Sequence, residues 1–298
     1  MTGRQAPAVR PFSERYGPWA VVTGAARAEG IGFGFARHLA GRHVNVVLVD
    51  VLGDELELRA QELRDRYHVK VESVPLDLGA VDFIDELHVA TAGLDVGLVV
   101  CNHALIPMEA PTILDTPLET HHQMIDVNAR AYTTLVHHFG RRFVTAGRGG
   151  ILLVSSQGGL RGTAFEGGYS ANKAFQMMLG ESLWYELRGT GVDVLVLAPG
   201  LTRTQGDGMD GYPQVMVMPV DPVVAEALDG LGQRHLVIPG RLNKVFHVMT
   251  SRFMSRRRAV TTNGSFMARG LGRDPSRPFV GPGAPVRPGD TAWTHPDP

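Results

Sequence analysis

Residues 21–32 read VVTGAARAEGIG: an apolar run, a loop with glycines at positions 24, 30 and 32, and the start of a helical pattern. Glycine lets the backbone turn tightly and approach a phosphate closely, and a helix N-terminus offers free N–H groups and a partial positive charge. Alone the loop is a weak signal, because many glycine-rich loops are plain turns or only allow close helix packing. In its strand–loop–helix setting it predicts a dinucleotide site at Gly24, Arg27, Gly30, Ile31 and Gly32.

A carboxylate ends the second apolar run at a suitable distance from this loop. Asp50 lies 18 residues after Gly32, close to the spacing of about 20 residues for the acidic group that binds a ribose 2′-hydroxyl. A carboxylate repels the 2′-phosphate of NADP, so Asp50 favours NAD(H). Arg27 argues the other way if its guanidinium pairs with that phosphate rather than with solvent. We therefore expect NAD(H), with NADP(H) as the alternative.

Apolar runs of strand length alternate with segments of helix length. The runs are apolar throughout, which is typical of strands covered on both faces. We predict strands at 19–23, 44–50, 69–75, 96–101, 151–155, 192–198 and 235–238, and helices at 32–40, 53–67, 80–90, 120–144 and 168–187. This alternation indicates an α/β protein of the Rossmann type: a three-layer, doubly wound parallel sheet of about seven strands with helices on both faces.

Composition limits the other classes. The chain has 298 residues, is 44% hydrophobic and carries a net charge of −1, so it can form a core and has no evident reason to bind nucleic acid. A single cysteine, Cys101, excludes an intrachain disulfide and a cysteine-built metal site. With no apolar run long enough for a membrane span and no secretory signal, we expect a cytoplasmic protein. We predict an N-terminal arm at 1–16, one domain at 17–271 and a Pro/Gly/Arg-rich tail at 272–298.

An ordered set of residues further along the chain resembles the short-chain dehydrogenase/reductase family. Tyr169 and Lys173 form a Tyr-x-x-x-Lys motif, Ser156 precedes the tyrosine by 13 residues, Asn128 ends Asp-Val-Asn, and Pro-Gly follows the sixth run. With the glycine loop, the resemblance covers about residues 17–240. It implies the Rossmann fold, a nicotinamide cofactor and the main Tyr-x-x-x-Lys branch of the family.

Two segments depart from the family pattern. The loop between Gly24 and Gly30 carries two extra residues, which puts the detailed pyrophosphate contacts in question. The family's Asn-Asn-Ala-Gly reads Cys101-Asn102-His103-Ala104 in this chain. His103 and Ala104 stand where the family has a smaller residue and a glycine, at a strand end near the adenosine side, so we expect a changed affinity for the cofactor.

The resemblance implies a catalytic set of Ser156, Tyr169, Lys173 and Asn128. Tyr169 would act as the acid/base. Lys173 follows four residues later on a predicted helix, so the two side chains share one face of that helix. A nearby ammonium lowers the pKa of a phenol from its ordinary value of about 10. Lys173 would also hold the nicotinamide ribose, Ser156 would bind the substrate oxygen, and Asn128 would hold a water that links Lys173 to solvent. The family spacing favours Ser156 over its neighbour Ser155, which we expect to end the strand.

The resemblance also implies further cofactor contacts. Asp77 would lie beside the adenine, although it could equally cap a turn, and one of two threonines would contact the nicotinamide end. The set is Asp77, Leu78, Asn102, Tyr169, Lys173, Pro199, Gly200, Thr202 and Thr204.

The sequence indicates the substrate-binding residues less clearly than the cofactor-binding residues. A variable loop at about 204–219 contains Met209 and Met216, and Leu160, Phe165 and Glu166 precede Tyr169. Flexible thioethers suit an irregular apolar surface, so we expect an apolar ketone or secondary alcohol, unless these methionines only pack the loop on the core.

A C-terminal helix is predicted at about 241–258. Apolar residues at helical spacing, surrounded by arginines over 241–260, could lie on an anionic membrane surface. More often such a helix covers a core or a subunit contact, and family members are commonly homo-oligomers.

We expect no metal, because the adjacent pairs at 121–122 and 137–138 are histidines that point about 100° apart on a helix.

The sequence thus predicts an NAD(P)-dependent oxidoreductase that transfers a hydride between the nicotinamide and an apolar ketone or alcohol. Two alternatives stay open. One is a sensor or scaffold that binds the dinucleotide without turnover. The other is a lyase, epimerase or dehydratase on the same fold.

Overall fold

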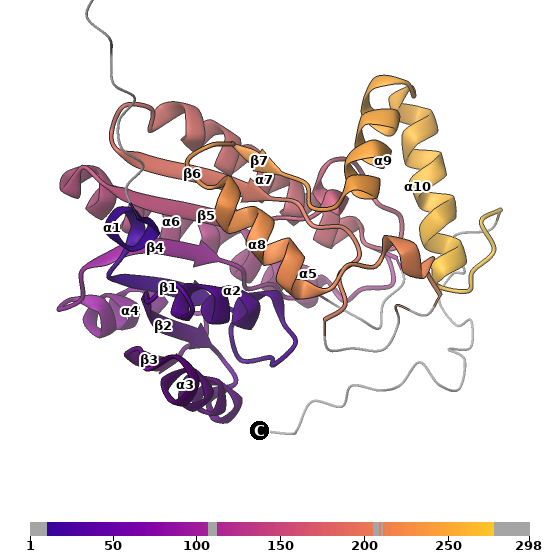
Figure 1. The fold of residues 1–298 in the computed structure, drawn as a ribbon. Helices are drawn as coiled ribbons and strands as arrows, with labels where there is room; N and C mark the ends of the chain where they lie inside the picture. The colour runs from indigo at the N-terminus through magenta and orange to yellow at the C-terminus, as the bar shows by residue number, and fades with distance from the viewer. Residues whose placement is uncertain (1–10, 107–111, 205–208, 210, 277–298) are drawn as a thin grey trace, which may run out of the picture.

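A computed structural model describes residues 11–106, 112–204, 209 and 211–276. Its centre is a seven-stranded sheet of order β3-β2-β1-β4-β5-β6-β7, in which all neighbouring strands are parallel (Figure 1). The strands are β1 (Trp19–Thr23), β2 (Asn45–Asp50), β3 (Val71–Pro75), β4 (Val96–Cys101), β5 (Gly149–Val154), β6 (Val192–Leu197) and β7 (Leu236–Val237). The predicted Rossmann-type α/β fold is confirmed.

Helices cover both faces of the sheet (Figure 1). One face packs against α2 (Ile31–Ala40), α3 (Gly53–Tyr67) and α8 (Val220–Gly230). The other packs against α4 (Phe83–Thr91), α6 (Ala131–Ala146) and α7 (Gly167–Glu186). Strands β1, β4 and β5 are buried along their whole length, which explains their unbroken apolar runs, whereas the edge strand β3 exposes Glu72 and Pro75.

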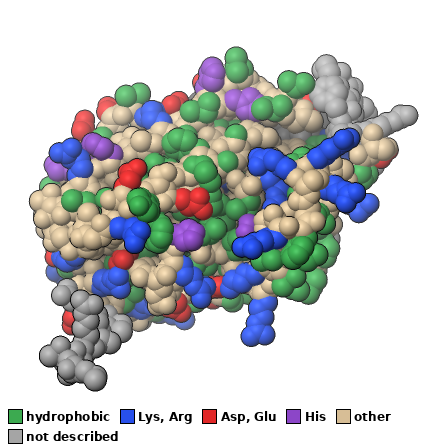
Figure 2. Space-filling model, turned by 90° about the horizontal axis from the view of Figure 1, so that it is seen from above, with side chains coloured by type: hydrophobic (Ala, Val, Ile, Leu, Met, Phe, Trp, Pro, Cys, Tyr) green, Lys and Arg blue, Asp and Glu red, His purple; other side chains and the backbone are tan. Residues whose placement is uncertain are grey.

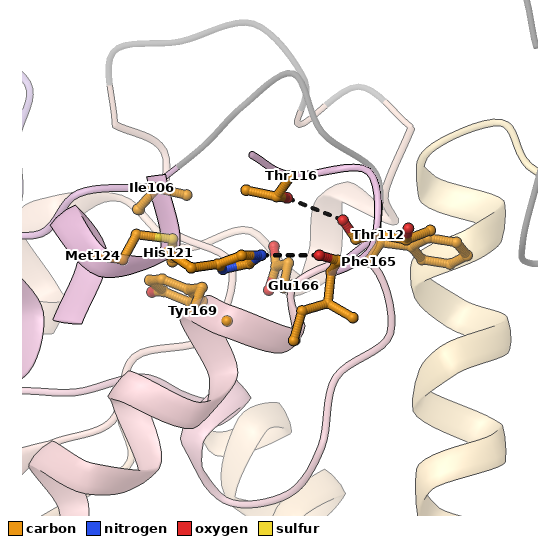
Figure 3. Close-up of a pocket in the computed structure, with 11 residues that line it drawn as sticks. Ile106, Thr112, Thr116, His121, Met124, Phe165, Glu166 and Tyr169 are labelled. Carbon is orange, nitrogen blue, oxygen red and sulfur yellow. Dashed lines mark hydrogen bonds between the residues drawn. The ribbon is translucent and has the colours of Figure 1, made fainter. Parts of the chain in front are cut away.

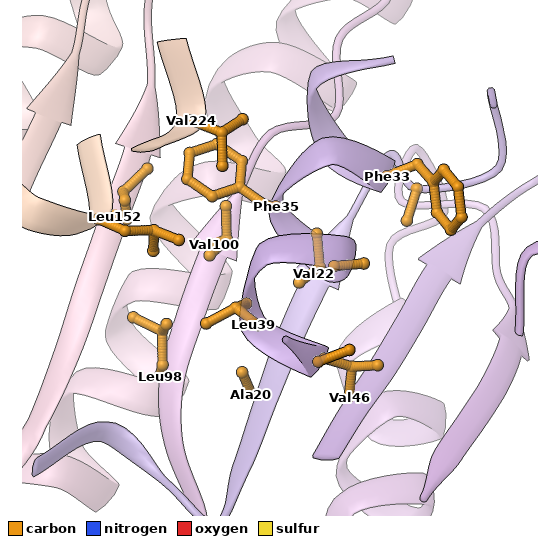
Figure 4. Packing of buried hydrophobic residues seen from close by; sticks show 14 of the residues in the cluster. Ala20, Val22, Phe33, Phe35, Leu39, Val46, Leu98, Val100, Leu152 and Val224 are labelled. Atoms are coloured by element: carbon orange, nitrogen blue, oxygen red, sulfur yellow. The ribbon is translucent and has the colours of Figure 1, made fainter. Parts of the chain in front are cut away.

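The first core layer lies between the sheet and α2 and α8. Figure 4 shows side chains from the central strands meeting those of the two helices, and all of them are completely buried: Val22, Val46, Leu98, Val100 and Leu152 from the strands, and Phe35, Leu39 and Val224 from the helices. This packing holds α2 and its preceding loop against the sheet.

The chain reverses its direction of winding between β1 and β4. β1 pairs with β2 on one side and with β4 on the other, so the loops that follow β1 and β4 leave the sheet in opposite directions. Ligands of open parallel sheets bind in the crevice at such a point, beyond the carboxyl ends of the strands. The glycine loop and residues 102–105 border this crevice.

The long helix predicted at 120–144 is interrupted. α5 (Leu118–Ile125) passes into a π-helical turn, η1 (Asp126–Arg130), before α6 begins. Such a turn loosens the regular helical hydrogen bonding and is frequent at functional sites. The backbone oxygen of Asn128, inside η1, accepts a side-chain hydrogen bond from α7.

The single C-terminal helix predicted at 241–258 is wrong in its extent. The structure has α9 (Arg241–Arg252) and α10 (Arg256–Gly270), which form a hairpin beside the sheet (Figure 1). Ser255 separates them because its backbone is extended and its Oγ accepts a hydrogen bond from the Arg258 N–H at 3.3 Å. This N-cap starts a new helix.

Part of the predicted N-terminal arm packs with the domain. Residues Phe12–Tyr16 form a short helix, α1, and Tyr16 is buried, with its hydroxyl donating to Asp193 at 2.8 Å. Residues 1–10 and most of the predicted tail, 277–298, lie outside the described residues. Among the described helices, none combines the length and the apolar character needed to cross a bilayer.

Alanine substitutions at two buried helix glycines test how closely the helices pack against their neighbours. A Cβ at Gly34 of α2 would lie 2.5 Å from Val220 Cγ1 of α8, whereas a Cβ at Gly140 of α6 would find its nearest neighbour, Ile151 Cδ1, at 3.6 Å. We expect Gly34→Ala to lower the free energy of unfolding by about 1–3 kcal/mol through overpacking. Gly140→Ala should raise it by about 0.5–1 kcal/mol through helix propensity. Urea unfolding measures both, and shifts of the same sign would contradict the described α2–α8 contact.

Candidate active site

The glycine loop is shaped by close approaches that exclude side chains. Gly24 has φ of +67°, in the region that favours glycine. A Cβ on Gly32 would lie 2.1 Å from the Gly24 oxygen. Gly30 precedes α2, and no side chain caps this helix end. The loop therefore presents the N-terminus of α2, beginning at Ile31, in the manner of an anion-binding site.

Asn102 ties this loop to the end of β4. Its Nδ2 donates to the backbone oxygens of Thr23 and Gly24 at 3.1 and 3.0 Å, and its N–H donates to Thr23 Oγ1 at 3.0 Å. The predicted cofactor residue Asn102 is thus placed as the anchor that fixes the shape of the loop.

His103 is enclosed by protein, with only 6% of its surface exposed. Its Nδ1 lies 2.8 Å from Thr23 Oγ1 and its Nε2 lies 3.0 Å from the Val127 oxygen. Burial, followed by the charge of Lys173, lowers the pKa of His103 to about 3, so the ring is neutral. The departure from the family pattern is absorbed inside the core.

Asp50 stands beside the glycine loop at the carboxyl end of β2. Its carboxylate accepts hydrogen bonds from the N–H groups of Ala26 at 3.0 Å and Leu52 at 3.3 Å. Arg27 lies on the same loop. An uncapped helix N-terminus, glycines where a Cβ would collide and a carboxylate at the next strand end together fit a dinucleotide.

Ser156 and Tyr169 meet at the carboxyl end of β5. Ser156 follows the strand and its Oγ accepts from the Gly158 N–H at 3.0 Å, while Tyr169 lies in the first turn of α7. The two side chains form a hydrogen bond. Ser155 turns inward instead, where its buried hydroxyl donates to the Lys173 backbone oxygen at 2.7 Å. The structure therefore brings Ser156, not Ser155, to the tyrosine.

Lys173 is buried one turn further along α7. Its Nζ donates to the Val154 oxygen at 2.8 Å and to Gln176 Oε1 at 3.0 Å. Gln176 Nε2 in turn donates to the backbone oxygen of Asn128 at 2.8 Å. The side chain of Gln176 therefore joins the amine of Lys173 to the backbone of Asn128.

The side chain of Asn128 is used elsewhere. Its Oδ1 accepts from the Leu105 N–H and its Nδ2 donates to the Leu105 oxygen, both at 2.8 Å. Asn128 therefore holds the segment after β4 against η1, while only its backbone faces the lysine.

The pKa values of Tyr169 and Lys173 differ from those that the sequence led us to expect. Burial raises the pKa of Tyr169 above its ordinary value of 10.0, the charge of Glu166 raises it further, and the hydrogen bond with Ser156 opposes both. Burial lowers the pKa of Lys173 to about 7. The expectation that Lys173 lowers the pKa of Tyr169 is therefore wrong for the free protein, because Nζ is turned to neutral acceptors and lies 5.5 Å from the centroid of the phenol ring.

The remaining predicted cofactor residues fall into two groups. Asp77 caps its own turn, accepting from the Gly79 N–H at 2.7 Å, and Leu78 beside it is buried. At the other end, the residues after β6 lie beside the turn that follows β5, since Gln157 N–H donates to the Pro199 oxygen at 2.9 Å.

The segment after Pro199 is closely folded. Thr202 is buried and its Oγ1 donates to the Gly200 oxygen at 3.1 Å, and the Thr204 N–H donates to the Thr202 oxygen at 2.9 Å. Of the predicted substrate loop, residues 205–208 and 210 lie outside the described residues.

A small hollow, with a volume of about 20 Å³, opens beside Tyr169 (Figure 3). Apolar side chains form much of it, with a few polar groups among them: Ile106, Thr112, Ile113, Thr116, His121, Met124, Phe165, Glu166, Gly167, Gly168 and Tyr169. Of the residues expected on the substrate side, Phe165 and Glu166 line this hollow, whereas Leu160, Met209 and Met216 do not. Among the described residues, no three His, Cys, Asp or Glu side chains lie close enough together to hold a metal ion.

A family model described as short chain dehydrogenase matches residues 18–210. The chain belongs to this family. It is 36% identical over 241 residues to a 7beta-hydroxysteroid dehydrogenase from Collinsella aerofaciens, covering 78% of this chain and 89% of that relative.

Solved structures agree with this assignment. A 7beta-hydroxysteroid dehydrogenase superposes with a TM-score of 0.79 at 30% identity, covering 86% of this chain and all of the other. A short-chain dehydrogenase from Sphingobium yanoikuyae, solved in complex with NADPH, superposes with a TM-score of 0.66 at 29% identity, over 74% of this chain and 87% of that one. The chain is a short-chain dehydrogenase/reductase, an oxidoreductase of the class that uses a nicotinamide cofactor.

Sequence reasoning missed two sets of residues at this site. Gln176 lies three positions after Lys173 on one helix, so helical spacing alone could have suggested the contact. The pocket residues Ile106, Thr112, Ile113 and Thr116 come from the segment between β4 and α5, which carries no motif. Only the folded chain brings that segment to the start of α7.

Proposed function

We propose that this short-chain dehydrogenase/reductase transfers a hydride between a nicotinamide cofactor and an apolar ketone or secondary alcohol. One observation carries the proposal: the phenol of Tyr169 lies between Ser156 and the buried amine of Lys173, at the edge of the hollow. Such an arrangement supplies a proton donor and a hydrogen-bond donor for the substrate oxygen.

The chemistry divides between the cofactor and the chain. The nicotinamide would supply the hydride to the carbonyl carbon. Ser156 would donate a hydrogen bond to the carbonyl oxygen, and Tyr169 would give its phenolic proton to that oxygen as the electrons of the C=O bond move onto it. The ammonium form of Lys173 would favour the resulting phenolate. Asn128 would act by fixing the segment after β4 and the turn that meets Gln176.

The raised pKa of Tyr169 bears on the direction of the reaction. A phenol that stays protonated at neutral pH is ready to donate a proton, which ketone reduction requires. Alcohol oxidation needs the phenolate, whose share rises as the pH rises. The free protein would therefore present Tyr169 as a proton donor, the role that ketone reduction requires.

NAD(H) is the proposed cofactor. Gly24, Arg27, Gly30, Ile31 and Gly32 would face the pyrophosphate, and Asp50 would accept from the adenosine ribose. The carboxylate of Asp50 would repel a 2′-phosphate, which supports NAD(H) over NADP(H) even though a structural relative was solved with NADPH.

The hollow supports an apolar substrate. Ile106, Ile113, Met124 and Phe165 provide its apolar surface, and burial raises the pKa of Glu166, so this carboxyl resists ionisation at the wall. An uncharged carbonyl compound fits this surface better than an anionic one.

We also propose that the chain forms a homo-oligomer. α7 exposes large apolar side chains along its outer side: Phe175 is 41% exposed, Met178 57% and Tyr185 67%. A second copy would cover them, since contiguous apolar surface of this kind is typical of subunit contacts.

Tyr169→Phe tests the proposed proton donor. We expect NADH oxidation in the presence of a panel of aliphatic, aromatic and steroidal ketones to fall by about 100-fold or more, because the phenolic proton is lost. NADH affinity, measured by fluorescence titration, should stay within about threefold of the wild type, since the ring remains.

Ser155→Ala is the matched control and should retain activity. Wild-type turnover in Tyr169→Phe would exclude this mechanism; NADH binding without turnover of any ketone by the wild type would favour a sensor.

Asp50→Ala tests the cofactor preference. Removing the carboxylate should weaken NADH binding and strengthen NADPH binding, so that the ratio of the two dissociation constants changes by about tenfold or more. Isothermal titration of both cofactors with both proteins measures it. Tighter binding of NADPH than of NADH by the wild type would overturn the assignment.

A further inference from the structure

α9 and α10, with the link between them, form a segment that we call the basic hairpin, residues 241–270. It holds seven lysine and arginine residues and no aspartate or glutamate: Arg241, Lys244, Arg252, Arg256, Arg257, Arg258 and Arg269. Within the described part of the chain, Lys244 alone among them forms an ion pair, with Glu226. The six arginines are exposed.

Positive charge is concentrated where the two helices meet. Arg256, Arg257 and Arg258 occupy the first turn of α10, where the helix dipole is already positive and no acidic side chain compensates it. Arg256 also contributes, after burial, to lowering the pKa of Arg161. Within the described chain this positive charge is therefore available to bind an anionic partner.

An apolar stripe runs along the outer side of α9 between these cations. Leu242, Val245, Met249 and Phe253 recur at helical spacing, and Val245 and Phe253 are 60% and 72% exposed. The opposite side of α9 is buried, with Thr250 only 3% exposed. In Figure 2, which looks down on this end of the molecule, lysine and arginine side chains surround hydrophobic ones on the side of α9 and α10.

We propose that the basic hairpin docks on an anionic lipid surface, with the stripe in the headgroup region and the arginines paired with lipid phosphates. An amphipathic helix with cations around an exposed apolar side has the chemistry of an interfacial helix. Nucleic acid would pair with the arginines but leave the stripe in water. A second copy would place seven like charges against seven. Residues 277–298 carry two arginines and two aspartates, so their side chains add no net charge.

The hairpin also contacts the loop that lines the hollow. Asn263 Nδ2 of α10 donates to Thr163 Oγ1 at 3.2 Å, and just after the hairpin the guanidinium of Arg273 lies 5.3 Å from the centroid of the Phe165 ring. If the proposed function holds, a docked bilayer lies beside the route of an apolar substrate. The docking itself does not depend on that function.

The test measures co-sedimentation of the full chain with vesicles of phosphatidylcholine alone and of phosphatidylcholine mixed equally with phosphatidylglycerol. We expect binding to the anionic vesicles, released by high salt. The Arg256→Glu/Arg257→Glu variant should bind at least about 25-fold more weakly, about fivefold for each cation lost, and the two added carboxylates should weaken it further by repulsion. Phe253→Ser should also bind more weakly. Arg66→Glu/Lys70→Glu, a matched charge reversal on the far side of the fold, should bind like the wild type.

Several outcomes would overturn the docking. They are equal binding to neutral vesicles, no binding to either, full binding by Arg256→Glu/Arg257→Glu, and preference for duplex DNA over anionic vesicles. A dimer mass in light scattering that Phe253→Ser reduces to a monomer would assign the stripe to a second copy instead. Thermal melting of each variant confirms that it is folded, since the substituted side chains are exposed.

The buried amine of Lys173 is surrounded by neutral groups. The titratable groups that face it are Tyr169 on its own helix, Tyr132 of α6, whose ring centroid lies 5.8 Å away, and His103 after β4. All three are neutral near pH 7, because burial raises the pKa of both tyrosines and lowers that of the histidine. A buried ammonium at this point has only neutral oxygens as acceptors.

We infer that Gln176 is a positioning residue that holds Lys173 between β5 and η1 and favours its charged form. Gln176 is completely buried, and it alone contributes a side-chain acceptor to Nζ among the described residues, the other acceptor being the backbone of Val154. Its amide is itself fixed by the Asn128 oxygen. The contact with Tyr169 makes this inference bear on the proposed function, but its test does not use turnover.

The sequence contains three lysines, Lys70, Lys173 and Lys244, so ¹³C-lysine NMR can follow Lys173 directly in the cofactor-free protein. The wild-type pKa of Lys173 should be about 7. Gln176→Glu should raise it by about one unit or more, because a carboxylate favours the ammonium. Gln176→Leu should lower it, since an acceptor is lost. Asn172→Leu, which removes another buried amide from the same helix, should leave it unchanged.

Opposite shifts in the two Gln176 variants distinguish positioning from a loss of packing, which would move both in the same direction. Shifts of the same sign, or none in either variant, would overturn the inference. Ketone turnover can fail without affecting this result, so failure of the proposed function and of this inference are distinguishable.

Discussion

The burial of one amine governs the arrangement of the whole site. Lys173 is 2% exposed, and burial alone opposes its charge, so its position requires oxygen acceptors at fixed places. One is the carboxyl end of β5; the other is an amide held by the π-helical turn before α6. The sheet, α6 and α7 must therefore keep their relative places for the lysine to remain where Tyr169 can use it.

The cofactor side of the crevice depends on backbone shape in the same way. Gly24 and Gly32 approach so closely that no side chain fits, and Asn102 bonds to two carbonyls of the loop and fixes that shape. The two extra residues of this loop do not disturb its ends. His103, which departs from the family pattern, is accommodated by bonds to β1 and η1.

Local pattern was sufficient to predict the sheet, because apolar runs and glycine loops report directly on strands covered twice. It was also sufficient to predict that Ser156, Tyr169 and Lys173 meet, since their spacing belongs to one recognisable family. It could not predict the direction of the Tyr169 pKa, which depends on burial and on where Nζ points. Nor could it show that the apolar stripe after residue 240 faces outward or that Ser255 divides the helix, because both depend on tertiary contacts.

The central claim is that Tyr169 stands as a protonated phenol in the free protein and acts as the proton donor to a carbonyl oxygen. A ¹³Cζ-tyrosine NMR titration tests it most directly, with the resonance assigned by its loss in Tyr169→Phe among the 6 tyrosines of the chain. The account predicts that this resonance keeps its phenol position up to and beyond pH 10.0, the ordinary pKa of tyrosine. A Tyr169 resonance that titrates near neutral pH would contradict it.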